Sequence, residues 1–226
     1  MFDLEDWLTL LRDWRYFAEG LGQTVKASGL ALLLALGIGV VVGVLSVAPW
    51  RPVRGLTRVY VEFFQNTPLV VHAFFLYYGL PHLGISLPVL AVGVLALGVY
   101  TGAYISEVIR AGIQSIHRGQ LEAAYSQGFT YLQAMRYIIL PQAFRVVMPP
   151  LTNQMVNLIK NSAVLAMIAG DELMYRADGW SSYNFLYRQA YTAVALLYLC
   201  LTLPLATVAR RLEQRLLGRE SREVPL

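Results

Sequence analysis

The chain is poor in charged side chains and in the residues that build redox or metal sites. Asp, Glu, Lys and Arg make up 14% of its 226 residues, against about 25% in soluble domains. Cys200 is the only cysteine, which excludes an internal disulfide framework, and we interpret it as a small apolar core residue. The three histidines are scattered along the chain. We therefore expect no metal site.

Residue sets for catalysis are lacking as well. The sequence contains no Gly-x-x-x-x-Gly-Lys-Ser/Thr loop for binding phosphate, so the chain is not expected to hydrolyse ATP alone. No Ser-His-Asp set and no convergent acid–base group stands out. These absences disfavour a membrane enzyme, and we expect no cofactor to be bound by this chain.

Apolar residues dominate instead, at 57% of the chain, and they occur in long runs. A membrane-spanning helix needs about 20 predominantly apolar residues. The sequence therefore predicts an all-α integral membrane protein with five transmembrane helices. The predicted spans are residues 27–48, 56–80, 87–109, 149–170 and 192–212. Gly39 and Gly43, like Gly98 and Gly102, have the small-xxx-small spacing that permits close helix approach.

The N-terminal segment, residues 1–22, has a different pattern. Apolar side chains recur at helical spacing, and Asp6, Arg12, Asp13 and Glu19 lie off that stripe. This pattern predicts an amphipathic helix lying in the membrane interface, and packing of the helix against protein is the alternative. The stripe consists of Leu4, Trp7, Leu8, Leu11, Trp14, Ala18 and Leu21.

Lys and Arg are concentrated on one side of the predicted spans. Arginines follow the first span, surround the loop 111–141 and follow the fifth span, whereas residues 81–86 contain none. The positive-inside rule therefore places the loop and the tail 213–226 in the cytoplasm and the N-terminus outside, although three basic residues near the N-terminus argue against this orientation. Segment 171–191 then faces outside, and its acidic residues lack the spacing of a calcium-binding loop.

The predicted cytoplasmic loop is long and carries its own helix signals. Residues 120–127 are strong helix formers, and Gly128 is predicted to end that helix in a left-handed conformation. Phe129 and Tyr131 are then placed to fill a pocket on a partner, and Pro141 marks the start of the next helix. The length and central position of the loop favour a docking site over simple membrane contact.

The same loop carries a family resemblance. Its spacing resembles, at every position, the EAA loop of ABC-importer inner-membrane permeases, and the similarity covers about residues 20–215. Flanking motifs resemble the polar amino-acid uptake subfamily, with its histidine, glutamine and glutamate permeases. The loop positions are Glu122, Ala123, Ala124, Gly128, Ile138, Leu140 and Pro141. The flanking motifs include Asn66-Thr67-Pro68-Leu69, Gly119-Gln120, Gln142-Ala143 and Lys160-Asn161-Ser162.

This resemblance implies the type I ABC importer transmembrane-domain fold, in a bacterial inner membrane. Residues 23–212 are then the transmembrane permease domain, which contains the coupling loop 111–141. The implied partners are a second permease (as a homodimer or a heterodimer), an ABC ATPase dimer that carries ATP-Mg, and a periplasmic amino-acid-binding protein; nucleic acid is not expected. A self-contained secondary transporter or channel is the alternative, which the docking loop and the odd number of spans disfavour.

In this family the loop would form the coupling helix, which sits in a groove of the ATPase. Energy would reach this non-catalytic chain mechanically, with Glu122 anchoring the loop and Gly128 providing the turn. The residues implied in ATPase coupling are Gln120, Glu122, Ala123, Ala124, Gly128 and Phe129.

Polar residues inside the predicted spans indicate a substrate path. Asn153, Asn157 and Lys160 share one face of a predicted helix. That helix is predicted to begin at Pro149-Pro150 and to be distorted at Asn161-Ser162. A buried ammonium is a candidate functional group: Lys160 either meets the carboxylate of an amino acid, pairs with Glu62, or reaches the membrane surface. The predicted path comprises Gln65, Asn66, Thr67, His72, Asn153, Asn157, Lys160 and Ser162.

Two of these positions depart from the family pattern, which commonly has arginine at Gln65 and glutamine at His72. His72 is interpreted as hydrogen-bonded between helices in preference to a pH sensor. Glu107 and Arg110 are predicted to form an ion pair one helical turn apart. The residues leave open which polar L-amino acid is carried, with a lean to acidic and amide side chains.

Overall fold

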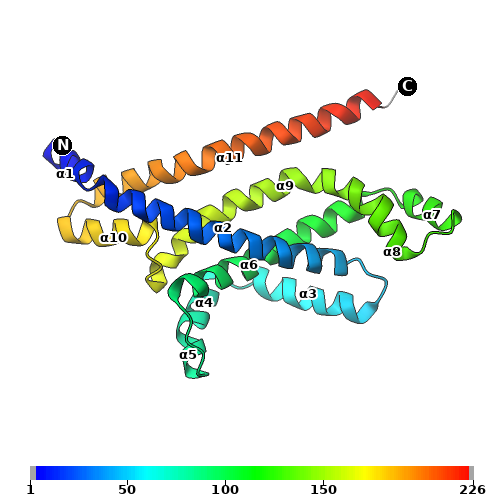
Figure 1. Ribbon diagram of the computed structural model, residues 1–226, viewed down its shortest axis with the longest axis horizontal. Coiled ribbons are helices and arrows are strands. Elements are labelled where there is room, and N and C mark those ends of the chain that lie inside the picture. The colour runs from blue at the N-terminus through cyan, green and yellow to red at the C-terminus, as the bar shows by residue number, and fades with distance from the viewer. Residues whose placement is uncertain (1–3, 224–226) are drawn as a thin grey trace.

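Four long helices form the frame of the structure, a computed structural model that describes residues 4–223. They are α2 (Trp14–Leu45), α6 (Val89–Ser115), α9 (Leu140–Asn161) and α11 (Tyr187–Glu223), and they run along the long axis of the molecule (Figure 1). Shorter elements connect them. These are α1 (Leu4–Arg12), α3 (Arg51–Gln65), α4 (Leu69–Phe74), the π-helical turn η1 (Phe75–Gly79), α5 (Leu80–His82), α7 (Arg118–Ser126), α8 (Tyr131–Ala134), the π-helical turn η2 (Met135–Ile139), the 3-10 helix η3 (Ser162–Ile168) and α10 (Leu173–Asn184).

Three helices of the described part are long and apolar enough to cross a membrane: Trp14–Leu45, Val89–Ser115 and the stretch Tyr187–Arg211 of α11. They cover most of the first, third and fifth predicted spans. The all-α membrane fold is therefore confirmed. The second and fourth predicted spans, 56–80 and 149–170, are each divided between several elements.

The first spanning helix begins much earlier than predicted. The amphipathic segment 1–22 is divided, because α1 ends at Arg12 and α2 begins at Trp14; residues 1–3 lie outside the described part. The buried face of α2 runs without a break from Phe17 through Thr24 to Gly43, which explains why the helix does not stop at the start of the apolar run. Leu10 is the buried side chain of α1. The predicted stripe is exposed at Leu4, Leu8 and Leu11, so these three side chains do not pack against protein.

Close packing of α2 against α6 forms the centre of the bundle. A Cβ atom built on Gly39 would lie 2.3 Å from Cγ2 of Ile105, and one on Gly43 would lie 2.7 Å from Cβ of Ile109. The contact is reciprocal, because a Cβ on Gly98 would lie 2.6 Å from Cδ2 of Leu34. Glycine is required where a neighbouring side chain takes the place of its Cβ. The predicted role of these glycines is confirmed.

The second predicted span bends at Asn66, Thr67 and Pro68, between α3 and α4. Proline cannot donate a backbone hydrogen bond and disfavours helix in the residue before it. The carbonyls left at the end of α3 are satisfied locally: Nδ2 of Asn66 donates to the Glu62 carbonyl at 2.7 Å, and Oγ1 of Thr67 donates to the Phe63 carbonyl at 2.7 Å. After the bend, α4, η1 and α5 form an arm that projects from the bundle (Figure 1).

The fourth predicted span is the second half of α9 followed by η3. Pro149 and Pro150 lie inside α9, which begins at Leu140 with Pro141 in its first turn. The prediction that the proline pair opens the helix is therefore wrong, whereas the predicted start at Pro141 is confirmed. Membrane helices tolerate internal proline when neighbours satisfy the freed backbone groups. At Asn161 the helix tightens into the 3-10 helix η3, as the distortion predicted at Asn161-Ser162 requires.

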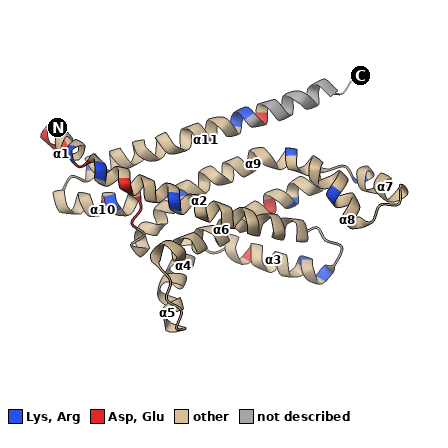
Figure 2. Cartoon of the chain, viewed as in Figure 1, with Lys and Arg blue, Asp and Glu red and all other residues tan. Residues whose placement is uncertain are grey.

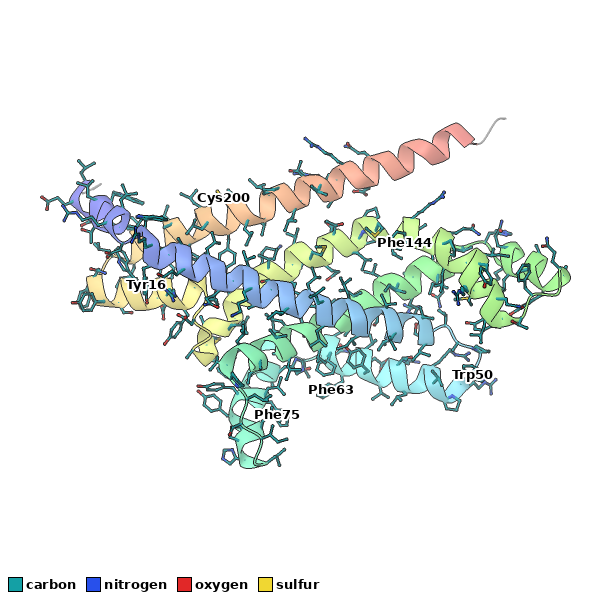
Figure 3. The ribbon with its side chains drawn as sticks, in the orientation of Figure 1. Tyr16, Trp50, Phe63, Phe75, Phe144 and Cys200 are labelled. Atoms are coloured by element: carbon teal, nitrogen blue, oxygen red, sulfur yellow. The ribbon has the colours of Figure 1, made fainter. Side chains whose placement is uncertain are left out.

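The two ends of the bundle carry different elements. The connection α7–α8 lies at the end where α2 and α6 finish and α9 begins, and α1 and α10 lie at the opposite end (Figure 1). Lys and Arg lie on α3, α8 and α9 toward the α7 end and on α11, and they also lie on α2 and α10 toward the opposite end (Figure 2). Cys200 is exposed on α11 (Figure 3), so its interpretation as a core residue is wrong. The tail 213–226 continues α11 as far as Glu223, and residues 224–226 lie outside the described part.

Candidate functional site

The predicted docking helix is α7, which begins at Arg118 and ends at Ser126. The Nδ1 atom of His117 caps its first turn by accepting the N–H of Gly119 at 3.1 Å. Gly128 follows with a φ of 84°, and the N–H of Phe129 returns to the Ala124 carbonyl at 3.1 Å. A left-handed residue of this kind closes a helix and favours glycine. The predicted left-handed end of the helix is confirmed.

One face of α7 is seated on the protein and the other is open. Ala124 is buried, with 1% of its surface exposed, and Leu121 packs against the main hydrophobic core. Gln120, Glu122 and Ala123 are exposed. Among the residues implied in coupling, Ala124 therefore faces inward and Phe129 is half-buried. Gln120, Glu122, Ala123 and Gly128 remain on the open side.

The segment after α7 is tied to the first spanning helix. Thr130 and Gln133 form a reciprocal cap at the start of α8, with the Thr130 N–H donating to Oε1 of Gln133 at 2.8 Å. The hydroxyl of Tyr131 then donates to the carbonyl of Val47, just beyond α2, at 3.2 Å. The expectation that Tyr131 fills a pocket on a partner is therefore wrong. A displacement of α8 acts directly on the end of α2.

A polar cavity of about 420 Å³ lies between α6 and α9; we call it the amide cavity. The hydroxyls of Tyr100 and Tyr104 are 3.0 Å apart on its α6 side. Oγ1 of Thr101 is buried and has no hydrogen-bond partner in the described part of the chain. A buried polar atom without a partner costs about 1–3 kcal/mol. The cavity is lined by Tyr100, Thr101, Tyr104, Gln154, Asn157, Leu158, Lys160 and Asn161.

Only part of the predicted substrate path meets in this cavity. Asn157 and Lys160 line it, whereas Asn153 does not, and Gln154 of the next helical position takes its place. Gln154 was not predicted, although its spacing of three residues from Asn157 and seven from Asn161 marks the same helix face. Tyr100 also lines the cavity and was not predicted as a path residue.

The other predicted path residues have local partners. The side chains of Asn66 and Thr67 cap α3, as described above, and the Ser162 hydroxyl donates to the Ile159 carbonyl at 2.8 Å. His72 is buried, with Nε2 at 2.6 Å from the Thr67 hydroxyl. The rings of Phe63, Phe64 and Tyr100 surround its imidazole, with centroids 4.8 to 5.9 Å away. Neither Ser162 nor His72 lines the amide cavity.

A second cavity of about 590 Å³, here called the arginine cavity, lies at the α7 end of the bundle. Gln65 lines it and donates through Nε2 to the Ala103 carbonyl at 3.3 Å. Glu62 pairs there with Arg58, at 2.6 Å, so the alternative that Glu62 pairs with Lys160 is wrong. The predicted pair of Arg110 with Glu107 is confirmed, with Nε 2.9 Å from Oε1.

The opposite end of the bundle is held by an acid network. Glu172 is fully buried and accepts the N–H groups of Met174 and Tyr175 at 2.9 and 2.8 Å, and the Tyr198 hydroxyl at 2.9 Å. Burial raises the pKa of Glu172, and the two backbone hydrogen bonds oppose that shift. Arg176 pairs with Glu19 at 2.6 Å and with Asp171 at 2.9 Å. These acids therefore join α2, α10 and α11.

A helical membrane bundle with a polar cavity between its spans and a half-seated helix at one end is the arrangement of a transport component driven through a partner. The sequence model of the binding-protein-dependent transport system inner membrane component matches residues 35–218. The chain belongs to this family.

Individual relatives cover nearly the whole chain. A probable glutamine ABC transporter permease protein, GlnM of Bacillus subtilis (strain 168), is 46% identical over 207 residues, 92% of this chain and 96% of the relative. The arginine transport system permease protein ArtQ of the same organism is 34% identical, covering 89% and 92%. The glutamate/aspartate import permease protein GltJ of Escherichia coli (strain K12) is 35% identical, covering 87% and 85%.

Solved structures agree with this fold. A chain from the crystal structure of an amino acid ABC transporter with histidines superposes with a TM-score of 0.87 at 32% identity, covering 95% of this chain and 99% of that one. An inward-facing MetNI methionine ABC transporter has a TM-score of 0.63 at 17% identity, covering 94% and 99%. The second likeness supports the fold alone.

Proposed function

We propose that this chain is the permease subunit of an ATP-driven importer that carries polar L-amino acids delivered by an extracytoplasmic binding protein. The observation that carries the proposal is α7, whose inner face is seated through Leu121 and Ala124 while Gln120, Glu122 and Ala123 remain open. Such a helix takes up force from a docked partner and passes it to the bundle. An ABC ATPase dimer, which holds ATP-Mg, supplies that force.

The substrate class rests on the amide cavity. Its size is within the usual range of about 300–1,000 Å³ for small-ligand sites. Lys160 supplies a cation for an α-carboxylate, and Gln154, Asn157 and Asn161 supply amides for polar groups. The names of the relatives refer to glutamine, arginine and glutamate/aspartate. The amides support acidic and amide amino acids as the preferred cargo.

The substrate path in this proposal includes fewer residues than the sequence predicted. Asn157 and Lys160 contact the substrate in the amide cavity, and Gln65 lies on the route toward the α7 end. Thr67 and His72 hold the bend between α3 and α4. Lys160→Met is expected to lower uptake or to change the preference among amino acids, whereas Asn153→Ala is the matched change on the same helix outside the cavity.

The orientation follows from charge. The α7 end carries Lys and Arg on α3, α8, α9 and α11 (Figure 2), so this end faces the bacterial cytoplasm with the C-terminus, and the N-terminus lies outside. The arm formed by α4, η1 and α5 exposes Phe75 at 66% of its surface, and α3 exposes Phe63 at 55% (Figure 3). A second permease, either another copy or a sister chain, covers this apolar face.

Reconstitution tests the proposal directly. The chain is co-purified with the ATPase and binding protein encoded beside it, placed in liposomes, and supplied with amino acids one at a time. ATP-dependent uptake, with ATP hydrolysis stimulated by one group of amino acids, is the expected result. Uptake by the purified chain without an ATPase would show a self-contained secondary transporter or channel and would overturn the proposal.

A further inference from the structure

The arginine cavity lies apart from the amide cavity and has its own chemistry. It forms where α3 starts beside the last turns of α2 and α6, so it opens at the same end as α7. The Tyr60 hydroxyl, also on α3, donates to the Val99 carbonyl at 2.6 Å and links α3 to α6. The cavity is lined by Ser46, Arg54, Gly55, Thr57, Arg58, Val61, Glu62, Gln65, Glu107, Arg110 and Gln114.

Charges of both signs face this space. Three guanidinium groups and two carboxylates line the cavity, and they form two separate pairs, Arg58 with Glu62 on α3 and Arg110 with Glu107 on α6. Arg54 is held in place by donating through Nη1 to the Ala48 carbonyl at 2.8 Å. An anion alone would meet the repulsion of two carboxylates, and a cation alone would meet three arginines.

The α3 pair is the one that opens easily. The side chains of Arg58 and Glu62 are 79% and 57% exposed, and exposed ion pairs of this kind stabilise a protein little. Within the described part of the chain, the bond to Glu62 engages only Nε of Arg58, which leaves the four Nη–H donors of the guanidinium for a carboxylate. Arg110 is more firmly held, because its Nη1 also donates to Oε1 of Gln114 at 2.8 Å.

We propose that the arginine cavity is a second amino-acid site, which binds the released zwitterion at the exit side of the permease. Arg58 and Arg54 bind the α-carboxylate, and Glu62 binds the α-ammonium. The carboxylate and the ammonium of the ligand therefore replace Glu62 and Arg58 as each other's partners, and no charge is left unpaired. The cavity volume of about 590 Å³ accommodates an amino acid with its side chain.

Occupation of this site has a kinetic consequence. A zwitterion bound between α3 and α6 holds these helices at their present separation. It lies beside the end of α6, which leads into the coupling loop, and near the end of α2, where Val47 accepts the Tyr131 hydroxyl. A ligand that binds one conformation better shifts the population toward it. Amino acid that accumulates inside should therefore slow its own import. This inference rests on the proposed function as an importer.

The test uses the complete transporter in liposomes, with ATP inside and the binding protein outside. The lumen is loaded in turn with L-glutamine, L-glutamate, L-arginine or L-histidine, and the initial uptake rate is compared with that of unloaded liposomes. The luminal concentration of the transported amino acid that halves uptake should rise about tenfold in Arg58→Gln and in Glu62→Gln, since each loses a charged hydrogen bond to the ligand.

Two controls separate this site from general effects of charge. Arg145→Gln removes a cation on α9 that does not line the cavity, and it should keep the wild-type inhibition. If L-glutamine is the inhibitor, luminal glutaramate, which lacks the ammonium, and 4-aminobutanamide, which lacks the carboxylate, should each inhibit about tenfold less well. Inhibition by either analogue equal to that by glutamine overturns the zwitterion assignment.

The outcomes also separate this inference from the proposed function. ATP-driven uptake by the wild type that luminal amino acid does not slow overturns the second site and leaves the importer intact. Inhibition that persists unchanged in Arg58→Gln and Glu62→Gln but is lost in Asn157→Ala assigns it to the amide cavity and overturns the proposal. Absence of ATP-driven uptake in the unloaded wild type, with all subunits present, overturns the importer itself.

Discussion

The α2–α6 pair and the divided segments around it differ in the continuity of their helices and in how closely they pack. The pair consists of two continuous apolar helices, brought together by glycines on both partners. The divided segments, α3–α4 and α9–η3, break at polar residues, and their helices α3 and α9 line the two cavities opposite α6. Tight packing resists change in shape, whereas a helix break permits it. The difference teaches that the pair forms a rigid frame and that each cavity lies between this frame and a helix that can bend.

The largest expected effect comes from breaking the frame. In Gly39→Ala the new Cβ meets Cγ2 of Ile105 at 2.3 Å, so we expect a loss of about 3 kcal/mol in the free energy of unfolding. Unfolding of the purified chain in mixed detergent micelles measures this free energy. Gly37→Ala is the matched control, because a Cβ there meets nothing within 4 Å, and it should gain up to about 1 kcal/mol. Equal effects of the two changes would contradict the rigid frame.

The next effect concerns the coupling loop. Gly128→Val places a β-branched residue at a φ of 84°, a strain of about 1–3 kcal/mol, so α7 should lose its closing turn. We expect ATP-driven uptake to fall while membrane insertion is unchanged. Gly84 has a φ of 78° with nothing within 4 Å, so Gly84→Val imposes the same strain away from the loop and should leave uptake intact. Equal losses in both variants would argue against a specific role for the loop.

A smaller effect tests a polar side chain that the frame helix α6 contributes to the amide cavity. Thr101→Val removes a buried hydroxyl that has no partner in the described part of the chain, so stability should rise by about 1 kcal/mol while the apparent KM for uptake increases. Thr152→Val is the control, because its hydroxyl donates to the Met148 carbonyl at 3.0 Å; it should lose stability. A Thr101→Val variant with an unchanged KM would remove this hydroxyl from substrate binding.

The smallest expected effect is a pH dependence at the α10 end. Burial raises the pKa of Glu172 above its ordinary value of 4.5, so the folded state binds the proton more tightly than the unfolded state. The stability contributed by protonated Glu172 is full below pH 4.5 and is lost as pH rises through the raised pKa, with a slope of at most about 1.4 kcal/mol per pH unit. Thermal unfolding against pH should show this slope in the wild type. A slope that persists in Glu172→Gln belongs to another group.

The features that could be predicted are those with local signals. Apolar runs indicate α2, α6 and α11, the glycine spacing indicates close packing, and Gly128 indicates a left-handed helix end, because each depends on residues near one another in the chain. The start of α2 at Trp14 could not be read in this way, since its first turns are stabilised by contacts with α10 and α11, such as Thr24 with Glu172.

The polar character of the candidate site could be predicted from the sequence, but the set of residues that line the cavity could not. Lys160 and Asn157 were identified by their polarity in an apolar run. The selection of Gln154 over Asn153 depends on which face of α9 meets α6. Likewise, Tyr131 is placed by the Val47 carbonyl, more than eighty residues away in the chain. Contacts of this kind have no local sequence signal.

The bend between α3 and α4 has a mechanical consequence. The bonds from Asn66 and Thr67 to the carbonyls of Glu62 and Phe63 stay within α3, and the N–H of His72 returns to Pro68 within α4. A change in ψ of Thr67, the free torsion next to the fixed φ of Pro68, therefore breaks none of these hydrogen bonds. The hydrogen bond between Thr67 and His72, together with the rings around that imidazole, crosses the bend. The arm can therefore change its angle to α3 at this bend, while Leu69 and Ala73 of α4 keep its base anchored in the main core.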